Sequence, residues 1–244
     1  MISDGDRVLV GLSGGMDSLT LMWTLSERLE RIRVDYRLHA VYLDPGFEGG
    51  YSQKLADYCK HAGYRLTIEH TDFGVRSHSR NNRENPCFLC SWERRKRLFK
   101  FAETLGCSKV ALGHNKDDII ETLFMNICYA GQISTMIPSQ TFFNGKITVI
   151  RPLAYVEKET IRQFAVEQRF PEFTNPCPSA TNSKRQYIKG LLDQLYQSND
   201  KIKGNIFRSM KNVKPEYLLT SQNPGINRVM RTHSKNEDKA KIQF

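Results

Sequence analysis

Residues Val8–Leu21, VLVGLSGGMDSLTL, place an apolar strand pattern directly before a glycine turn and a helix pattern. The run Val8–Leu12 is typical of a buried strand, and the apolar spacing after Asp17 is helical. Gly14 and Gly15 allow the backbone to approach a ligand closely, and the first N–H groups of a helix have no internal partners. The junction therefore predicts an anion site, most simply one for phosphate oxygens.

The spacing and side chains of this turn narrow the kind of anion that it can hold. The turn matches neither a Walker A loop, which needs a Lys-Ser/Thr pair, nor a G-x-G-x-x-G dinucleotide turn. Asp17 would repel a bare phosphate, so we expect a bridging Mg²⁺ unless the turn only caps its helix. The residues predicted to hold a magnesium nucleotide are Ser13, Gly14, Gly15, Asp17 and Ser18.

A second strand-to-helix junction carries the same kind of polar loop. Leu112–Asp118, LGHNKDD, follows a short apolar run and precedes a helical pattern. Asn115 and the acids would suit a capped helix, but the carboxyl-end loops of one parallel sheet also line one crevice. We therefore expect Gly113 and Asp118 to contact the same nucleotide, together with Leu43 at the end of another predicted strand.

Strand and helix patterns alternate through the first half of the chain. Such alternation predicts an α/β fold with a parallel twisted sheet and helices on both faces. The predicted strands cover Val8–Leu12, Leu38–Leu43, Arg65–Glu69 and Lys109–Leu112. The predicted helices cover Leu19–Arg31, Tyr51–His61, Ser91–Leu105 and Asp118–Tyr129.

The pattern changes after residue 135. Asn144-Gly145 between apolar runs predicts a small hairpin over Thr141–Ile150. Further helices are predicted at Glu157–Gln168, Asn182–Tyr196 and Ile202–Val213. We therefore predict a nucleotide-binding domain at 1–135, a hairpin and basic helical extension at 136–219, and a disordered tail at 220–244. Neither a membrane span nor a signal peptide is recognisable, so a cytoplasmic protein is expected.

The net charge of +10 is concentrated in two stretches. Residues 76–100 hold eight Lys or Arg against two Glu, and residues 184–214 hold eight against two Asp. Two basic runs beside cysteine motifs favour a polyanionic partner over two solvated helix faces. The candidate contacts to an RNA backbone are Arg94, Arg95, Lys96, Arg97, Lys184, Arg185 and Lys189.

The six cysteines occupy positions 59, 87, 90, 107, 128 and 177. Two residues separate Cys87 from Cys90, which brings both sulfurs to one centre, and Cys177 lies between two prolines. By itself this pattern leaves zinc, a redox disulfide and an iron–sulfur cluster open, and His78 or His114 could complete a zinc site. The cysteines at 59, 107 and 128 have no such context and are expected to be small core residues.

Taken together, these motifs resemble one family. SGGMDS at 13–18 resembles the SGGxDS signature of the PP-loop ATP pyrophosphatases, which have an adenine nucleotide α-hydrolase-like fold, and GHNKDD is similar to the second motif of their tRNA-thiolating members. The resemblance extends over about Gly5 to Leu219 and is to the tRNA 2-thiocytidine synthetases, the TtcA-like proteins. It is carried by PCFLC at 86–90, DIIETLFMN at 118–126, IRPLAYV at 150–156, Cys177 and NVKPEYLL at 212–219.

The resemblance implies an ATP-dependent tRNA sulfurtransferase. Such an enzyme adenylates a base carbonyl, expected here at C2 of an anticodon-loop cytidine, and replaces the oxygen with sulfur. The resemblance implies catalytic roles for Asp17, Asp118 and Cys177, and a 4Fe–4S cluster held by Cys87, Cys90 and Cys177. It further implies ATP, Mg²⁺, tRNA and a sulfur donor, either a cysteine desulfurase or sulfide, and it is compatible with a homodimer.

The sequence differs from the family pattern in two respects, and two other functions are compatible with it. Family members often have Lys where Met16 stands, and they usually carry a helical segment before the first strand. One alternative function is a PP-loop thiolase for another tRNA base, or one that uses a cysteine persulfide without a cluster. The other alternative is a zinc-containing nucleotide- and RNA-binding module without catalysis.

Overall fold

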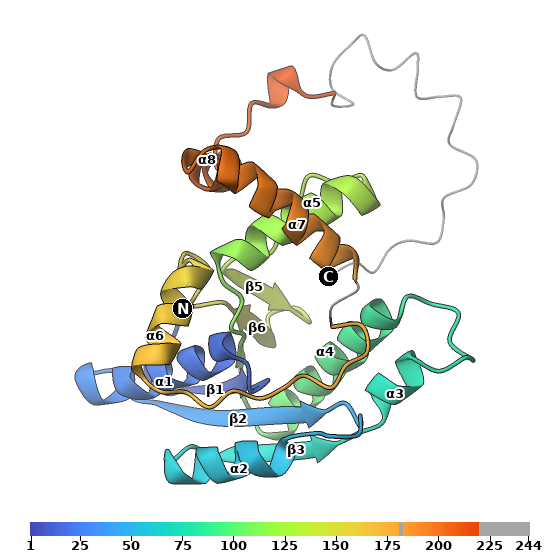
Figure 1. Ribbon diagram of the computed structural model, residues 1–244. Coiled ribbons are helices and arrows are strands. Elements are labelled where there is room, and N and C mark those ends of the chain that lie inside the picture. The colour runs from blue at the N-terminus through green and yellow to red at the C-terminus, as the bar shows by residue number, and fades with distance from the viewer. Residues whose placement is uncertain (181–182, 220–244) are drawn as a thin grey trace. The chain divides into compact units, whose positions relative to one another are not determined.

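The computed structural model describes residues 1–180 and 183–219, and its framework is a six-stranded sheet with helices on both faces (Figure 1). The strand order is β3-β2-β1-β4-β6-β5. All neighbouring pairs are parallel except the edge pair of β5 and β6. The strands are β1 (Asp6–Gly11), β2 (Tyr36–Asp44), β3 (Leu66–His70), β4 (Lys109–Ala111), β5 (Ser139–Phe142) and β6 (Ile147–Ile150). The predicted α/β fold is therefore confirmed.

The helices follow the predicted alternation along the chain. Those of the first half are α1 (Met16–Arg31), α2 (Ser52–His61), α3 (Phe73–Ser77), α4 (Pro86–Thr104) and α5 (Lys116–Ala130). Those of the second half are α6 (Lys158–Glu167), α7 (Lys184–Ser198), α8 (Lys201–Ser209) and the short 3₁₀ helix η1 (Pro215–Tyr217).

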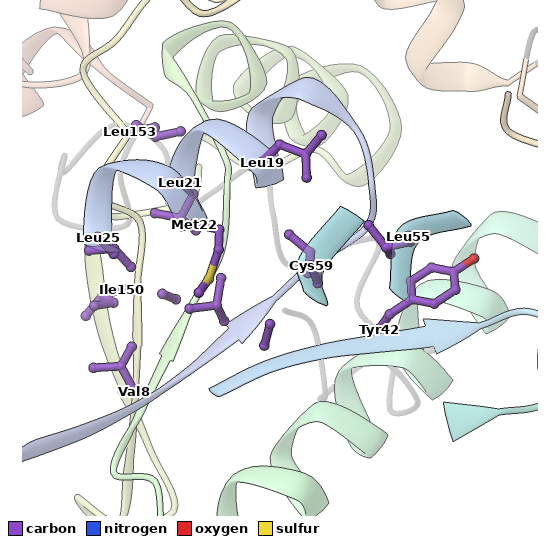
Figure 2. Packing of buried hydrophobic residues seen from close by; sticks show 14 of the residues in the cluster. Val8, Leu19, Leu21, Met22, Leu25, Tyr42, Leu55, Cys59, Ile150 and Leu153 are labelled. Atoms are coloured by element: carbon purple, nitrogen blue, oxygen red, sulfur yellow. The ribbon is translucent and has the colours of Figure 1, made fainter. Parts of the chain in front are cut away.

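Different helices cover the two faces of the sheet. Val8 and Val10 of β1 belong to a core cluster that also contains buried residues of α1, α2 and α6 (Figure 2). Leu9, which lies between them, belongs to a second cluster with Leu98 and Ala102 of α4. Successive side chains of a strand point to opposite faces, so β1 is apolar at all three positions because both of its faces are buried.

The strand order places the predicted ligand crevice at the carboxyl ends of β1 and β4. The connections through α1 and α2 add β2 and β3 on one side of β1, whereas α4 leads across to β4 on the other side. Where the strand order of an open α/β sheet reverses in this way, the loops after the two neighbouring strands lead in opposite directions. They leave room for a ligand between them. The loops after β1 and β4 are the two polar loops that the sequence singled out.

The predicted hairpin is confirmed and is an integral part of the sheet. Its second strand, β6, pairs in parallel with β4, with Val110 opposite Val149. Phe143, Asn144 and Gly145 all have positive φ, at 53°, 54° and 94°, so the Asn-Gly pair supplies left-handed turn positions. As a result the carboxyl end of β6 reaches the same edge of the sheet as those of β1 and β4.

The largest difference from the predicted elements is the start of α4. This helix begins at Pro86 rather than Ser91, because Pro86 suits the first helical turn and Asn85 caps it. The Asn85 side chain accepts hydrogen bonds from the backbone N–H groups of Cys87 and Phe88. The short helix α3 was not predicted, since its five residues are too few to show a helical period.

The described chain divides into two compact units, Met1–Ser198 and a second unit that begins at Asn199. The first unit contains the whole sheet. The predicted domain boundary after residue 135 remains a prediction, and the predicted tail at 220–244 lies outside the described residues. Among the helices of the described residues, none has the length and apolar character needed to cross a bilayer.

We predict that the packing of α1 on the sheet limits the stability of the first unit. Leu21 is fully buried in the cluster shown in Figure 2, so Leu21→Ala should lower the free energy of unfolding by about 2–5 kcal/mol. The matched control is Val166→Ala on α6, where 66% of the residue is exposed and the change should stay within about 0.5 kcal/mol. Urea unfolding measures both variants, and equal losses would contradict this core assignment.

Candidate active site

The turn between β1 and α1 is closed by its own hydroxyl groups. Ser18 Oγ accepts hydrogen bonds from the backbone N–H of Ser13 at 3.1 Å and from Ser13 Oγ at 3.2 Å, and it donates to the Gly15 carbonyl at 2.9 Å. Gly15 is the N-cap and has no side chain to satisfy the first N–H groups of α1. The turn is therefore rigid, while the start of the helix remains able to bind an anion.

Asp17 connects this turn to the loop after β4. Its Oδ1 accepts a hydrogen bond of 2.8 Å from Asn115 Nδ2, and Asn115 is fully buried. Burial raises the pKa of Asp17, and the negative charge of Asp118 raises it further, whereas Lys158 and the Asn115 hydrogen bond oppose the shift. The folded protein therefore holds this carboxylate at an energetic cost, which a bound cation would offset.

Gly113 allows the two loops to approach each other at backbone distance. A Cβ atom at this position would lie 2.9 Å from the Asp17 carbonyl oxygen and 3.1 Å from the Ser18 backbone nitrogen. Neither atom can move without displacing the first turn of α1. The sequence prediction placed Gly113 at the ligand, and the structure shows that it also sets the spacing of the crevice.

Asp118 lies in this crevice but is already part of a capping box. Its Oδ2 accepts the Asn115 backbone N–H at 3.0 Å, and the Asn115 side chain accepts the Asp118 N–H at 3.1 Å. Its Oδ1 lies 3.5 Å from Arg185 Nη1, and the same guanidinium nitrogen donates to Glu121 at 3.1 Å. Asp118 therefore fixes the loop after β4 and holds Arg185 of α7 near it.

At the end of β2, the side chains of Leu43 and Asp44 contact other parts of the protein. Leu43 is 6% exposed, and its side chain packs in the core cluster that contains Leu98 of α4, so its backbone is the part that a ligand could reach. The next residue, Asp44, uses its side chain locally. Its Oδ1 accepts the Gly46 N–H at 2.9 Å, and its Oδ2 lies 3.3 Å from His70 Nδ1.

Two aromatic residues that the sequence did not single out support the turn after β1. The Tyr51 hydroxyl donates a hydrogen bond of 2.7 Å to the Ser13 carbonyl, and the ring of Phe173 stacks on Tyr51 with centroids 4.9 Å apart. Both rings also contact the position where a Cβ of Gly14 would stand. Isolated aromatic residues in polar loops give no periodic signal, which is why sequence patterns could not identify them.

The structure brings Cys87, Cys90 and Cys177 into one region. The first two lie in the first turns of α4, and Cys177 lies in the segment that follows Phe173. Burial raises the pKa of Cys90, and the nearby thiols of Cys177 and Cys87 raise it further, while the Arg94 charge lowers it. His78 contacts the same segment, since its Nε2 lies 2.8 Å from Ser179 Oγ and 3.9 Å from Cys177 Sγ.

Across residues 1–180 and 183–219, no group of three or more His, Cys, Asp or Glu side chains is arranged to hold one metal ion. In an iron–sulfur cluster each thiolate binds a different iron, so its ligands lie farther apart than those of a tetrahedral zinc. His114, the other residue considered for zinc, belongs to the loop after β4, where the charges of Asp118 and Arg185 act on it.

The remaining cysteines only partly match expectation. Cys59 and Cys107 are 1% and 5% exposed, which confirms them as core residues. Cys128 is exposed, so the prediction for it was wrong. It lies near the end of α5, and the residues next to it, Ile127 and Tyr129, are also exposed.

Some of the residues predicted to contact RNA are exposed, and others are half-buried or already form ion pairs. Arg94 and Lys96 are exposed on α4, whereas Arg97 already donates to Glu69 at 2.7 Å and Arg95 is half-buried. On α7, Lys184 is exposed above the Tyr129 ring, Arg185 pairs with Glu121, and Lys189 is half-buried. Arg97 therefore also helps to hold α4 on β3 through Glu69. All seven positions remain predicted contacts.

A cavity of about 510 Å³ lies away from this crevice. It is lined by Phe99 and Lys100 of α4, by Cys107 and Ser108 before β4, and by the hairpin turn at Phe143. These segments adjoin the amino ends of β4 and β6. The cavity is therefore at the opposite end of the strands from the loops that hold Asp17 and Asn115.

The chain is similar to the PP-loop domain family and to curated proteins that share one name. The PP-loop domain family matches residues 3–195. The tRNA-cytidine(32) 2-sulfurtransferase of Geobacter sulfurreducens is 39% identical over 222 residues, which are 90% of this chain and 86% of that protein. The protein of the same name from Pelobacter propionicus is 36% identical over 93% of this chain and 85% of its own length.

Among solved structures, the U34-tRNA thiolase NcsA from Methanococcus maripaludis with its 4Fe–4S cluster is similar to this chain. The two align with a TM-score of 0.72 and 25% sequence identity, over 88% of this chain and 74% of that one. The relationship therefore extends beyond the turn after β1 to nearly the whole described chain.

We predict that Gly113→Ala damages the crevice although alanine is small. The added Cβ would meet backbone atoms of α1, so unfolding free energy should fall by about 1–3 kcal/mol and ATP binding should weaken. Gly190→Ala on α7 is the matched control, because nothing lies within 4 Å of its Cβ and the helix should gain about 1 kcal/mol. Unchanged ATP affinity in Gly113→Ala, measured by calorimetry, would contradict the close approach.

A second prediction concerns the charge of Asp17. Its pKa is raised in the folded protein, so its protonated form favours folding at low pH, and this contribution is lost as pH rises through the folded pKa. Asp17→Asn should therefore raise the melting temperature at pH 7, and the gain should shrink as pH falls toward about 3.9, the ordinary pKa of Asp. ATP cleavage should be lost in the same variant.

Melting curves between pH 4 and pH 8 and pyrophosphate release measure the two effects of Asp17→Asn. A melting-temperature difference that does not depend on pH would contradict the assigned charge. Pyrophosphate release at the wild-type rate would contradict the functional role.

Proposed function

Because the chain belongs to the PP-loop domain family and, within it, to the family of the tRNA-cytidine(32) 2-sulfurtransferases, we propose that it is an ATP-dependent tRNA-cytidine sulfurtransferase. The substrate is a tRNA whose cytidine C2 oxygen is replaced by sulfur at the expense of ATP, which leaves as AMP and pyrophosphate. The observation that carries this proposal is the adjacency of the turn after β1 and the region that contains Cys87, Cys90 and Cys177.

That adjacency runs through Tyr51 and Arg94. Tyr51 is hydrogen-bonded to the Ser13 carbonyl, and the Arg94 charge acts on both Tyr51 and Cys90. Phe173, which stacks on Tyr51, lies four positions before Cys177 in the sequence. A base activated by ATP in the crevice would therefore be close to the cysteines that deliver sulfur.

The chain would bind MgATP mainly through the start of α1. Backbone N–H groups of Gly15 and the first helical turn would donate to phosphate oxygens, and the helix dipole would favour their charge. Mg²⁺ is usually held by one or two carboxylates together with substrate phosphates rather than by a cage of protein ligands. Asp17 would be such a ligand, and Asn115 would orient its carboxylate through the 2.8 Å hydrogen bond.

The residues at 87, 90 and 177 fit a 4Fe–4S cluster by ligand type and by their mutual proximity. Three thiolates leave one iron of such a cluster without a protein ligand, which is the position where a sulfur atom for transfer can be held. Arg94 would stabilise the thiolate of Cys90 by its charge. His78 and Ser179 would position the segment of Cys177.

The protein's contribution to the reaction is orientation and charge stabilisation. In the first step, the base oxygen bonds to the α phosphate of ATP, and the bond to pyrophosphate breaks. Donors at the α1 N-terminus would stabilise the charge that develops on the phosphates. In the second step, sulfide-level sulfur would bond to C2 as the C–O bond breaks, and AMP would leave with that oxygen. The target base must be unstacked from its neighbours to enter the crevice.

The proposal extends to the RNA contacts, the sulfur donor, the cellular location, the oligomeric state and the target base. Arg94, Lys96 and Lys184 would contact the RNA backbone, since they are exposed and basic. The sulfur donor is a cysteine desulfurase or sulfide, the site of action is the cytoplasm, and a homodimer is compatible with the activity. The identity of 39% to a cytidine enzyme, against 25% to the U34-tRNA thiolase, favours cytidine as the base.

Cys177→Ala tests the main proposal and its nearest alternative. We expect the variant to lose most iron and all thiolation of tRNA while it still binds ATP, because it removes one of three ligands and leaves the start of α1 unchanged. Cys128→Ala is the matched control, since Cys128 is exposed and distant in sequence from all three ligands. Iron analysis after anaerobic purification, calorimetry with ATP, and nucleoside analysis of reacted tRNA give the three readouts.

The results for Cys177→Ala distinguish a mechanism that uses a cluster from one that uses a cysteine persulfide. Full iron content in Cys177→Ala would exclude the three-ligand site. If the wild-type protein thiolates tRNA without containing iron and Cys177→Ala does not, the result would point instead to a persulfide on Cys177. Thiolated uridine instead of thiolated cytidine would leave the chemistry intact and correct the base.

A further inference from the structure

Arg151 is a buried cation that the proposed reaction does not use. It directly follows β6, in the IRPLAYV motif, and is 7% exposed. Its Nη1 donates to the Ile137 carbonyl at 2.6 Å, and its backbone N–H donates to the Pro138 carbonyl at 2.8 Å. Its Nε is buried without a hydrogen-bond partner in the described part of the chain. Burying an ionised group that is only partly paired costs free energy.

Arg151 lies among further positive groups. The charge of Arg95 on α4 acts on Arg151, and together with burial it lowers the pKa of Arg151 to about 10. His114, in the loop after β4, feels both guanidinium groups, and its buried Nδ1 also has no hydrogen-bond partner among the described residues. Neither Arg95 nor Arg151 forms a salt bridge with an acid at residues 1–180 or 183–219.

Asp118, the acid whose charge acts on His114, is already engaged. Asp118 and Glu121 pair with Arg185 from α7, and Asp118 also caps α5. Burial and the three arginines lower the pKa of His114 to about 4, so its ring is neutral at physiological pH. A neutral imidazole can donate one hydrogen bond and accept another, which adds a donor without adding a further buried charge.

The position of this group relates it to the crevice. Ala111 of β4 pairs with Ile150 of β6, and the Leu112 N–H donates to the Ile150 carbonyl, so the loops after the two strands begin side by side. Gly113 lies between this group and the start of α1, where it contacts Asp17. Arg151 and His114 therefore lie beside the predicted nucleotide site on the side of β6, and Arg95 approaches them from α4.

We propose that Arg95, Arg151 and His114 form a second phosphate-binding site, separate from the turn after β1, at the carboxyl ends of β4 and β6. Two uncompensated guanidinium groups and a neutral imidazole suit a phosphate group, which offers several acceptor oxygens and negative charge. Arg151 forms the buried floor of the site, and the half-buried Arg95 forms its accessible edge. The phosphate belongs either to ATP, as the departing pyrophosphate, or to the RNA backbone beside the target base.

The assignment of these two sources depends on the proposed function, whereas the binding of phosphate does not. The test compares wild-type protein with Arg151→Gln and Arg95→Gln, using Arg31→Gln as the charge-matched control. Arg31 lies at the far end of α1 from the turn and pairs with Glu27 in solvent. Inorganic pyrophosphate and unmodified tRNA serve as separate probes, and calorimetry, filter binding and the pyrophosphate-induced shift in melting temperature are the readouts.

A site for pyrophosphate predicts that both variants bind this probe about tenfold or more weakly, and that they lose most of the shift in melting temperature. A site for an RNA phosphate predicts instead weaker tRNA binding, with the salt-dependence slope reduced by about 0.7–0.9 per lost contact. Either result supports the site and identifies the source of the phosphate. Wild-type affinity for both probes in Arg95→Gln would overturn the proposal.

Arg95→Gln keeps the test decisive if Arg151→Gln fails to fold, because no hydrogen bond of the Arg95 side chain holds the described structure together. A purely structural role for Arg151 predicts a lower melting temperature without pyrophosphate and an unchanged shift with it, which would count against the site. Binding is measured without sulfur transfer, so a protein that does not thiolate tRNA would refute the proposed function and leave this test intact.

Discussion

The hydrogen bond between Asn115 and Asp17 is the contact on which the crevice depends. It joins two loops that lie 98 positions apart in sequence, and it holds a carboxylate whose pKa is raised by burial. The capping box of Asn115 and Asp118 orients the donor, and Gly113 brings the two backbones together. Each of these features alone would be an ordinary helix start. Together they fix an acid at the amino end of α1, where a magnesium nucleotide can use it.

The same crevice carries electrostatic costs that a ligand would offset. Asp17 is held as a partly buried carboxylate, and Arg151 is held as a buried cation with an unpaired nitrogen. Strain of this kind persists when the surrounding structure enforces it, and it tends to lie at functional sites. Bound MgATP would place positive charge beside Asp17 and phosphate beside the arginines. We therefore expect the protein to become more stable as its substrates bind.

The proposed cluster region is assembled from segments that lie far apart in the sequence. Cys87 and Cys90 stand at the start of α4, while Cys177 lies in a segment held by Phe173 on one side and by His78 and Ser179 on the other. Tyr51 then connects this region to the Ser13 carbonyl. The aromatic and hydrogen-bond contacts position the reactive groups, so loss of Tyr51 or Phe173 would disturb both halves of the site.

The sequence by itself determined the α/β fold, the parallel strands, the Asn-Gly hairpin and the two polar loops, because these depend on local periodicity and turn chemistry. It also indicated the CxxC pair and, through resemblance, Cys177 as its partner. Only the tertiary structure decided which basic residues are paired or buried: Arg97 is bound to Glu69, and Arg151, to which the sequence assigned no separate role within its motif, is buried near Arg95. The tertiary structure also shows that Cys128 is exposed and that the Tyr51 hydroxyl is hydrogen-bonded to the turn after β1. Burial and pairing depend on residues far apart along the chain, so no local pattern can reveal them.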